Sequence, residues 1–256
     1  MKRLHALLLA CSLLFAASAH AEKITVAAAA DLKFAMDEIV TAFKQANAGG
    51  EVDVIYGSSG KFHTQIQQGA PYDLYFSADI AFPRELVKAG FAASQAKPYA
   101  FGRIVLWSAS QDASKMTLAS LTDPKIARVA IANPKHAPYG KRAEEALRAS
   151  GLWEKVEPKL VYGENIAHTA QFVQTGNAQV GIIALALAVS PELANKGAYW
   201  LIPDKLHEPL EQGYIITKRA EGNALAQRFA AYMGSNTARA VMSRYGFVLP
   251  NEVVSK

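Results

Sequence analysis

Cysteine is nearly absent from this chain of 256 residues. The single cysteine, Cys11, lies in the first apolar stretch, so the rest of the chain has no thiol for a disulfide or a thiolate nucleophile. Glycine (17 residues) and proline (11 residues) occur at ordinary frequency, which excludes fibrous and low-complexity proteins. With 51% hydrophobic and 19% charged residues, the chain is expected to be globular, with a large core.

Charge of one sign is concentrated nowhere in the sequence. The formal net charge is +5, and loss of Lys2 and Arg3 with an N-terminal segment would leave 25 basic residues against 22 acidic ones, or +3. These charges are scattered, whereas a nucleic-acid-binding protein gathers its basic residues in a patch or stripe. We therefore expect no nucleic-acid partner.

A long apolar run is also missing. The apolar stretch 6–19 is shorter than the ~20 residues that span a bilayer, and no later stretch reaches that length. Basic residues precede this stretch, and Ala19-His20-Ala21 follows it as a small-x-small cleavage box. These features predict a signal peptide at 1–21, cleaved after Ala21, and a periplasmic mature protein.

Cys11 leaves a second kind of export open. The sequence Leu8-Leu9-Ala10-Cys11 has the form of a lipoprotein processing site, but the apolar stretch before Cys11 is about half as long as such signals require. Cleavage after Ala21 is the main prediction.

Strands and helices alternate along the predicted mature chain. The expected strands are 23–30, 51–56, 73–77, 104–107, 128–132, 159–161, 180–183 and 213–217. The expected helices are 32–43, 61–68, 81–89, 141–149, 166–175, 224–233 and 238–245. This alternation predicts an α/β protein with mostly parallel sheets flanked by helices. Chain crossings near 100 and 210 divide it into lobe I (22–101 plus 213–256) and lobe II (102–212), with a cleft between them.

Four junctions between a strand and a helix carry small, flexible or capping residues, two in each predicted lobe. They are Ala30-Asp31, Ser58-Ser59-Gly60, Pro138-Tyr139-Gly140 and Asn165-Ile166. A helix N-terminus presents unpaired N–H groups and the positive end of the helix dipole, and open α/β sheets bind ligands at the carboxyl ends of their strands. The four junctions therefore predict an anion site in the cleft.

Several segments, in order along the chain, resemble the periplasmic molybdate-binding proteins of ABC transporters. They are residues 24–32, 56–60, 69–79, 133–140 and 244–247. The resemblance covers essentially the whole mature chain. It implies a two-lobed periplasmic binding protein, type II-like, that binds molybdate or tungstate with high affinity between its lobes. The resemblance also implies delivery of the anion to an ABC permease in the inner membrane by a monomer with no cofactor and no catalysis.

The resemblance also assigns the ligand-binding residues. Ser59 matches a serine that gives its hydroxyl and its N–H, while Tyr139 and Ile166 match positions that donate a backbone N–H. Asp31 is a fourth candidate through its own N–H. Less direct candidates are Ala30, Ser58 and Ala184. No metal is expected beyond the metal centre of the oxyanion.

Two positions depart from the family. Asp31 stands where members often have a hydroxyl or amide, and a carboxylate repels a dianion. Asp31 is therefore expected to cap the N–H of Lys33 or Phe34, to be protonated, or to accept a hydrogen bond from the O–H of a protonated oxyanion such as hydrogenphosphate or hydrogenarsenate. Ala184 stands where some members have a tyrosine, and we expect the Tyr139 phenol to replace that donor.

Two alternatives remain open from the sequence. The chain can bind another oxyanion, such as phosphate, arsenate or sulfate. Alternatively, Ser58 and Lys61 have the Ser-x-x-Lys spacing of acyl-enzyme hydrolases, although the companion Ser-Asp-Asn and Lys-Thr-Gly motifs are missing. The chain is therefore expected not to be an enzyme.

Overall fold

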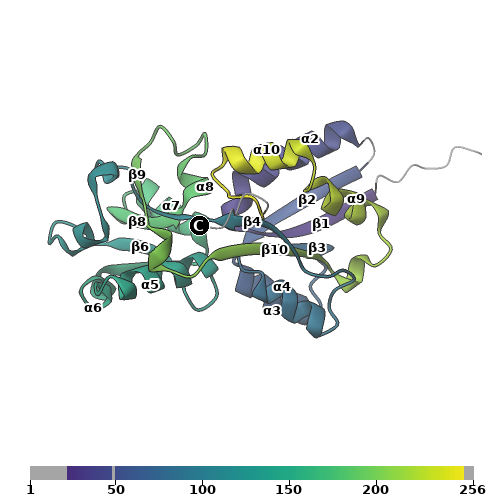
Figure 1. The fold of residues 1–256 in the computed structure, drawn as a ribbon, viewed down its shortest axis with the longest axis horizontal. Coiled ribbons are helices and arrows are strands. Elements are labelled where there is room, and N and C mark those ends of the chain that lie inside the picture. The colour runs from purple at the N-terminus through teal and green to yellow at the C-terminus, as the bar shows by residue number, and fades with distance from the viewer. Residues whose placement is uncertain (1–21, 48–49, 251–256) are drawn as a thin grey trace, which may run out of the picture.

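The computed structural model describes residues 22–47 and 50–250. The predicted signal peptide, its cleavage site and Cys11 lie outside the described residues. Two five-stranded sheets form two lobes that lie side by side, each covered by helices (Figure 1). The predicted two-lobed α/β class is thus confirmed. None of the helices in the described chain is long and apolar enough to cross a membrane.

The first sheet has the strand order β2-β1-β3-β10-β4. Its strands are β1 (Glu22–Ala29), β2 (Gly50–Gly57), β3 (Leu74–Ser77), β4 (Lys97–Gly102) and β10 (Leu210–Ile216). Its helices are α2 (Lys33–Ala46), α3 (Ser59–Gln67), α4 (Ala81–Lys88), α9 (Ala224–Tyr232) and α10 (Asn236–Arg244). A 3₁₀ turn, η1 (Ala30–Leu32), joins β1 to α2.

Helices cover both faces of this sheet, and the side chains of its central strands alternate between the two faces. Val26 packs with Phe43 and Phe229 in a core under α2, α9 and α10. The next residue of β1, Ala27, packs with Phe62 in a smaller core under α3 and α4 on the opposite face (Figure 1).

The second sheet has the order β7-β6-β8-β5-β9. Its strands are β5 (Ile104–Ser108), β6 (Val129–Ala132), β7 (Leu160–Gly163), β8 (Val180–Ala184) and β9 (Ala198–Leu201). Its helices are α5 (Pro138–Ala149), α6 (Trp153–Val156), α7 (Ile166–Gln174) and α8 (Leu185–Ala188). The other 3₁₀ turns are η2 (Ala113–Lys115), η3 (Leu118–Thr122), η4 (Glu157–Lys159), η5 (Asp204–Leu206) and η6 (Lys218–Ala220).

Both sheets are mixed, whereas the sequence pattern predicted mostly parallel ones. In the first sheet β1 runs parallel to β2 and β3, while β10 runs antiparallel to β3 and β4. The second sheet repeats this plan, with β6 parallel to β7 and β8, and β5 antiparallel to β8 and β9. The antiparallel strands β5 and β10 begin just after the chain has crossed between the sheets, so no βαβ unit fixes their direction.

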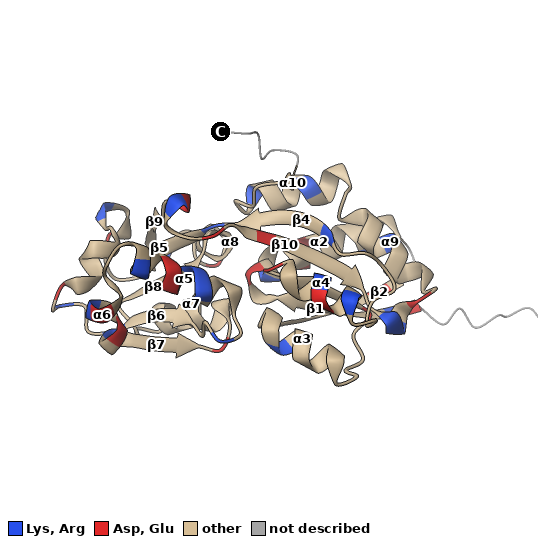
Figure 2. Cartoon of the chain, turned by 60° about the horizontal axis from the view of Figure 1, so that its bottom comes forward, with Lys and Arg blue, Asp and Glu red and all other residues tan. Residues whose placement is uncertain are grey.

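Acidic and basic residues are interspersed over both lobes (Figure 2). Neither lobe shows a stripe of one sign along a sheet or helix in this view, in keeping with the scattered charges of the sequence. The predicted lobe ranges, 22–101 plus 213–256 and 102–212, remain a prediction.

Candidate functional site

A small pocket lies between the lobes at the carboxyl ends of parallel strands of both sheets. Its lining residues are Ala29, Ala30, Asp31, Gly57, Ser58, Ser59, Ala78, Ala137, Pro138, Tyr139, Asn165 and Ile166. All four junctions singled out in the sequence contribute to it. The space open to the centre of a water molecule is about 10 Å³, which is room for about one water. A pocket of this size is far too small for an organic solute.

Three helices begin at this pocket. α3 starts at Ser59, α5 at Pro138 and α7 at Ile166. The first N–H groups of an α-helix have no partner within the helix, and the helix dipole favours negative charge there. Ser59, Tyr139 and Ile166 therefore offer backbone donors from both lobes to one point.

Local sequence explains how these helices begin. Pro138 occupies the first turn of α5, where its missing N–H costs nothing. Asn165 caps α7 by accepting the N–H of His168 at 2.9 Å, which leaves the Ile166 N–H for a ligand. Gly140 lies against β6, and a Cβ there would come within 2.0 Å of the Ala132 carbonyl oxygen. Only glycine lets α5 start so close to the strand.

Ser59 is held in place as a donor. Its side chain is buried, and its Oγ accepts the backbone N–H of Ala78 at 3.0 Å. The carbonyl of Ser59 accepts the Tyr75 hydroxyl at 2.8 Å. A hydroxyl carries one proton and can accept at its lone pairs. Because Ala78 uses an acceptor position, the Ser59 proton is available to an oxyanion.

Asp31 takes part in a buried polar network. Its Oδ2 accepts the Tyr139 hydroxyl at 2.9 Å and the Gln212 amide at 2.8 Å. Gln212 in turn accepts the Tyr99 hydroxyl at 2.6 Å. Asp31 is only 1% exposed, and its other oxygen, Oδ1, has no hydrogen-bond partner among the described residues.

Two sequence expectations for this region are corrected by the network. Asp31 does not cap Lys33 or Phe34, because it sits in η1 and neither η1 nor α2 has a side-chain cap. The Tyr139 phenol donates its single proton to Asp31, so it does not replace the missing tyrosine donor while that bond is made.

Burial sets the protonation of this network. It raises the pKa of Asp31 to about 6, although the hydrogen bonds from Gln212 and Tyr139, followed by the nearby backbone N–H groups of Asp31 and Leu32, act in the opposite direction. Burial, followed by the Asp31 charge, raises the pKa of Tyr139 and Tyr99 well above 10, so both phenols stay neutral. A unit negative charge about 5 Å from ionised Asp31 is repelled by about 3 kcal/mol at an effective dielectric constant of ~20.

The two lobes touch beside the pocket. Gly60 donates its N–H to the His136 carbonyl at 2.9 Å, and the Ser58 hydroxyl bonds to the same carbonyl and lies 2.9 Å from His136 Nδ1. Lys61 Nζ lies 2.9 Å from a carboxylate oxygen of Glu164. Burial, and then the Lys61 charge, lower the pKa of His136, so its ring is neutral at pH 7. These contacts join the two lobes beside the pocket.

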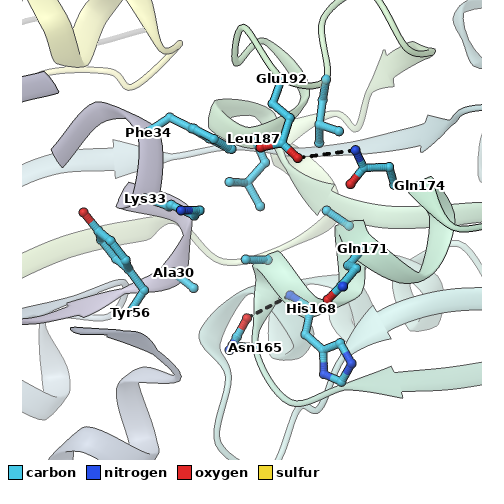
Figure 3. A pocket seen from close by; sticks show the side chains of 13 residues that line it. Ala30, Lys33, Phe34, Tyr56, Asn165, His168, Gln171, Gln174, Leu187 and Glu192 are labelled. Carbon is cyan, nitrogen blue, oxygen red and sulfur yellow. Dashed lines mark hydrogen bonds between the residues drawn. The ribbon is translucent and has the colours of Figure 1, made fainter. Parts of the chain in front are cut away.

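A larger hollow of about 350 Å³ adjoins the pocket and shares Ala30 and Asn165 with it (Figure 3). Lys33 and Tyr56 line it from one lobe, and His168 lines it from the other. The hollow carries one charge of each sign, Lys33 and Glu192.

The predicted site residues fall into two groups. The structure brings Asp31, Ser59, Tyr139, Ile166, Ala30 and Ser58 together in the pocket, although the Ser58 hydroxyl is used by His136. Ala184, at the end of β8, is buried and does not line the pocket. No group of three His, Cys, Asp or Glu side chains among the described residues is arranged to hold a metal ion.

Sequence reasoning missed Gln212 and Ala78, which position Asp31 and Ser59. Gln212 is 181 residues from Asp31, and its place on β10 carries no local signal. Ala78 follows β3 directly, so its end-of-strand position was the available clue.

Two α/β lobes that close around an ion-sized pocket define a solute-binding protein. The bacterial extracellular solute-binding protein family matches residues 24–248. The chain is 36% identical over 237 residues to the molybdate-binding protein ModA of Azotobacter vinelandii, covering 92% of this chain and 94% of that protein. It is 35% identical over 231 residues to ModA of Rhodobacter capsulatus, covering 90% of each.

A solved structure gives the same relationship. The periplasmic molybdate-binding protein of Azotobacter vinelandii superposes with a TM-score of 0.83 at 31% identity, covering 89% of this chain and 99% of that one. The chain belongs to the bacterial extracellular solute-binding proteins and, among them, to the family of the molybdate-binding proteins.

Proposed function

We propose that this protein binds molybdate or tungstate with high affinity in the interlobe pocket and delivers it to an ABC permease in the inner membrane. The observation that carries the proposal is the convergence of three helix N-termini and the Ser59 hydroxyl on an ion-sized pocket. The names of the ModA relatives support molybdate as the ligand.

The proposed donors are the N–H and hydroxyl of Ser59 and the N–H groups of Asp31, Tyr139 and Ile166. Each hydrogen bond to an ionised acceptor contributes about 1.5–3 kcal/mol. Five such bonds supply roughly 7–15 kcal/mol before the cost of association. A dissociation constant of 1 μM corresponds to about 8 kcal/mol net, so a submicromolar affinity requires these bonds to lie near the strong end of their range. Ala30 lines the pocket as a small residue that leaves room for the anion.

The pocket couples binding to closure. Ser59 and Asp31 belong to the first sheet's lobe, while Tyr139 and Ile166 belong to the other. An anion that contacts both pairs binds the closed form more tightly than the open one, and thereby shifts the population toward closure. A permease can then distinguish the loaded protein from the empty one by its shape.

The proposed role includes no chemical step. The Ser58 hydroxyl bonds to His136 and the Lys61 ammonium pairs with Glu164, so each half of the Ser-x-x-Lys pair has another partner. The further parts of the proposal are that the protein acts as a monomer without a cofactor. It reaches the periplasm by cleavage after Ala21.

Calorimetric titration of the purified protein tests this function. Molybdate and tungstate should each bind one ion per chain with a dissociation constant below about 1 μM, while sulfate should bind far more weakly. Strong binding of phosphate or arsenate without binding of molybdate or tungstate would contradict the proposal.

A further inference from the structure

One carboxylate oxygen of Asp31, a residue that lines the proposed anion pocket, has no hydrogen-bond partner among the described residues. Asp31 lines the pocket together with Ser59, Tyr139 and Ile166, and it is 1% exposed. Two donors already occupy its Oδ2, whereas Oδ1 has no hydrogen-bond partner among the described residues. A buried polar atom without a partner calls for an explanation, and a group that binds in the adjoining pocket is one.

An ionised carboxylate can only accept hydrogen bonds, and an oxyanion can only accept them as well. Ionised Asp31 therefore repels a dianion in this pocket and leaves Oδ1 unpaired. A protonated carboxyl does the reverse, because Oδ2 keeps its two donors from Tyr139 and Gln212 while Oδ1–H donates to the oxyanion.

Resting on the proposed function, we propose that a proton on Asp31 enters the site with the dianion, so that the pocket binds one oxyanion and one proton together. The proton comes from solvent and stays on Oδ1 while the anion is bound. Asp31 thus sets which oxyanions the pocket accepts and how their binding depends on pH.

The groups that face Asp31 do not compete for this proton. Tyr139 from α5 and Tyr99 from β4 are neutral phenols, and Gln212 from β10 is neutral. His136 reaches the site only through Ser58, and its pKa is lowered by burial and by Lys61. No lysine or arginine of the described chain forms an ion pair with Asp31 that would hold it ionised.

Proton coupling has a definite magnitude. Because burial raises the pKa of Asp31 to about 6, roughly nine-tenths of the empty protein is ionised at pH 7. Binding of a dianion then takes up about 0.9 proton per chain at pH 7. By linkage, affinity falls by nearly tenfold per pH unit above pH 7. Hydrogenphosphate carries its own O–H and can donate it to ionised Asp31, so it would bind without this uptake.

Calorimetry in buffers of different ionisation enthalpy measures the proton count directly. Titration of the protein with molybdate and tungstate at pH 7–8.5 should show uptake of about one proton per bound anion. Asp31→Asn keeps an oxygen in the place of Oδ2 and puts an N–H donor in the place of Oδ1. This variant should bind with little uptake and nearly constant affinity. Asp53→Asn is the matched control, because Asp53 is exposed and its carboxylate pairs with Lys23. This variant should retain the proton uptake.

The outcomes separate this inference from the proposed function. Tight molybdate binding with no proton uptake and no pH dependence would overturn the role of Asp31 and leave the function standing. Uptake that disappears in His136→Gln but persists in Asp31→Asn would also overturn it. If Asp31→Asn does not fold, infrared difference spectroscopy of the unaltered protein takes its place. Molybdate binding should then produce the band of a protonated carboxylic acid, and the absence of this band refutes the inference. Failure of molybdate and tungstate to bind at any pH would refute both.

Discussion

Replacing Ser59 by alanine is the substitution that most directly tests the geometry of the pocket. Ser59→Ala removes the hydroxyl proton proposed for the oxyanion and also removes the acceptor of the Ala78 N–H. A charge-assisted hydrogen bond is worth about 1.5–3 kcal/mol, so the dissociation constant for molybdate should rise about 10- to 150-fold. The backbone N–H of Ser59 remains, so binding should weaken without disappearing.

The same substitution has a separate effect on stability. Because Ser59 is buried, the Ala78 N–H loses its partner, at a cost of about 1–3 kcal/mol and about 2–4 °C in Tm for each kcal/mol. Ser94→Ala is the matched control, since Ser94 Oγ accepts the Ile216 N–H at 2.9 Å and lies away from the pocket. This control should lower Tm and leave molybdate affinity unchanged. Unchanged affinity in folded Ser59→Ala, measured by calorimetry, would refute the placement of the site.

Three further predictions concern closure and pH. Gly60→Ala would place a Cβ 2.7 Å from the His136 carbonyl oxygen and so push the lobes apart. Molybdate binding should weaken at least tenfold, and the radius of gyration of the molybdate complex in small-angle scattering should increase. An unchanged radius and affinity would contradict the closed contact. The pKa of Asp31 is about 6 in the folded protein, against an ordinary 3.8. The protonated carboxyl therefore contributes about 3 kcal/mol to the free energy of unfolding below pH 4, and this contribution is lost as the pH rises through 6. Urea unfolding of the anion-free protein should show that loss, and Asp31→Asn should remove it. Lys61→Ala breaks the exposed ion pair with Glu164. It should change the molybdate affinity measured by calorimetry by less than about fivefold, and by less still at high salt. A larger change would show that the pair controls closure.

The parts of the site visible in the sequence are those that local chemistry determines. Small and capping residues at the end of a strand mark a helix start, and this pattern located the junctions that contain Ser59, Tyr139 and Ile166, while the family resemblance singled out these three residues as ligand-binding candidates. The same local reasoning failed for Asp31, where it predicted an N-cap. Asp31 lies within the 3₁₀ turn η1 and so is not the N-cap of α2, and distant Gln212 holds its side chain.

The fold shows the same division. Strands with a continuous apolar pattern, such as β1 and β5, were predicted, while β4 and β9 were not. β4 contains Pro98 and ends at Gly102, and β9 has only four residues, so neither carries a strand pattern of its own. The antiparallel direction of β10 depends on where the chain re-enters the first sheet, and the local sequence does not determine this point of entry.

A crystal structure of the protein grown with molybdate, with the anomalous signal recorded at the molybdenum edge, tests the central claim most directly. We predict one molybdenum peak in the pocket, with oxygens within hydrogen-bonding distance of the Ser59 hydroxyl and of the N–H groups of Tyr139 and Ile166. An anion bound only in the neighbouring hollow beside Lys33, or no ordered molybdenum at all, would contradict it.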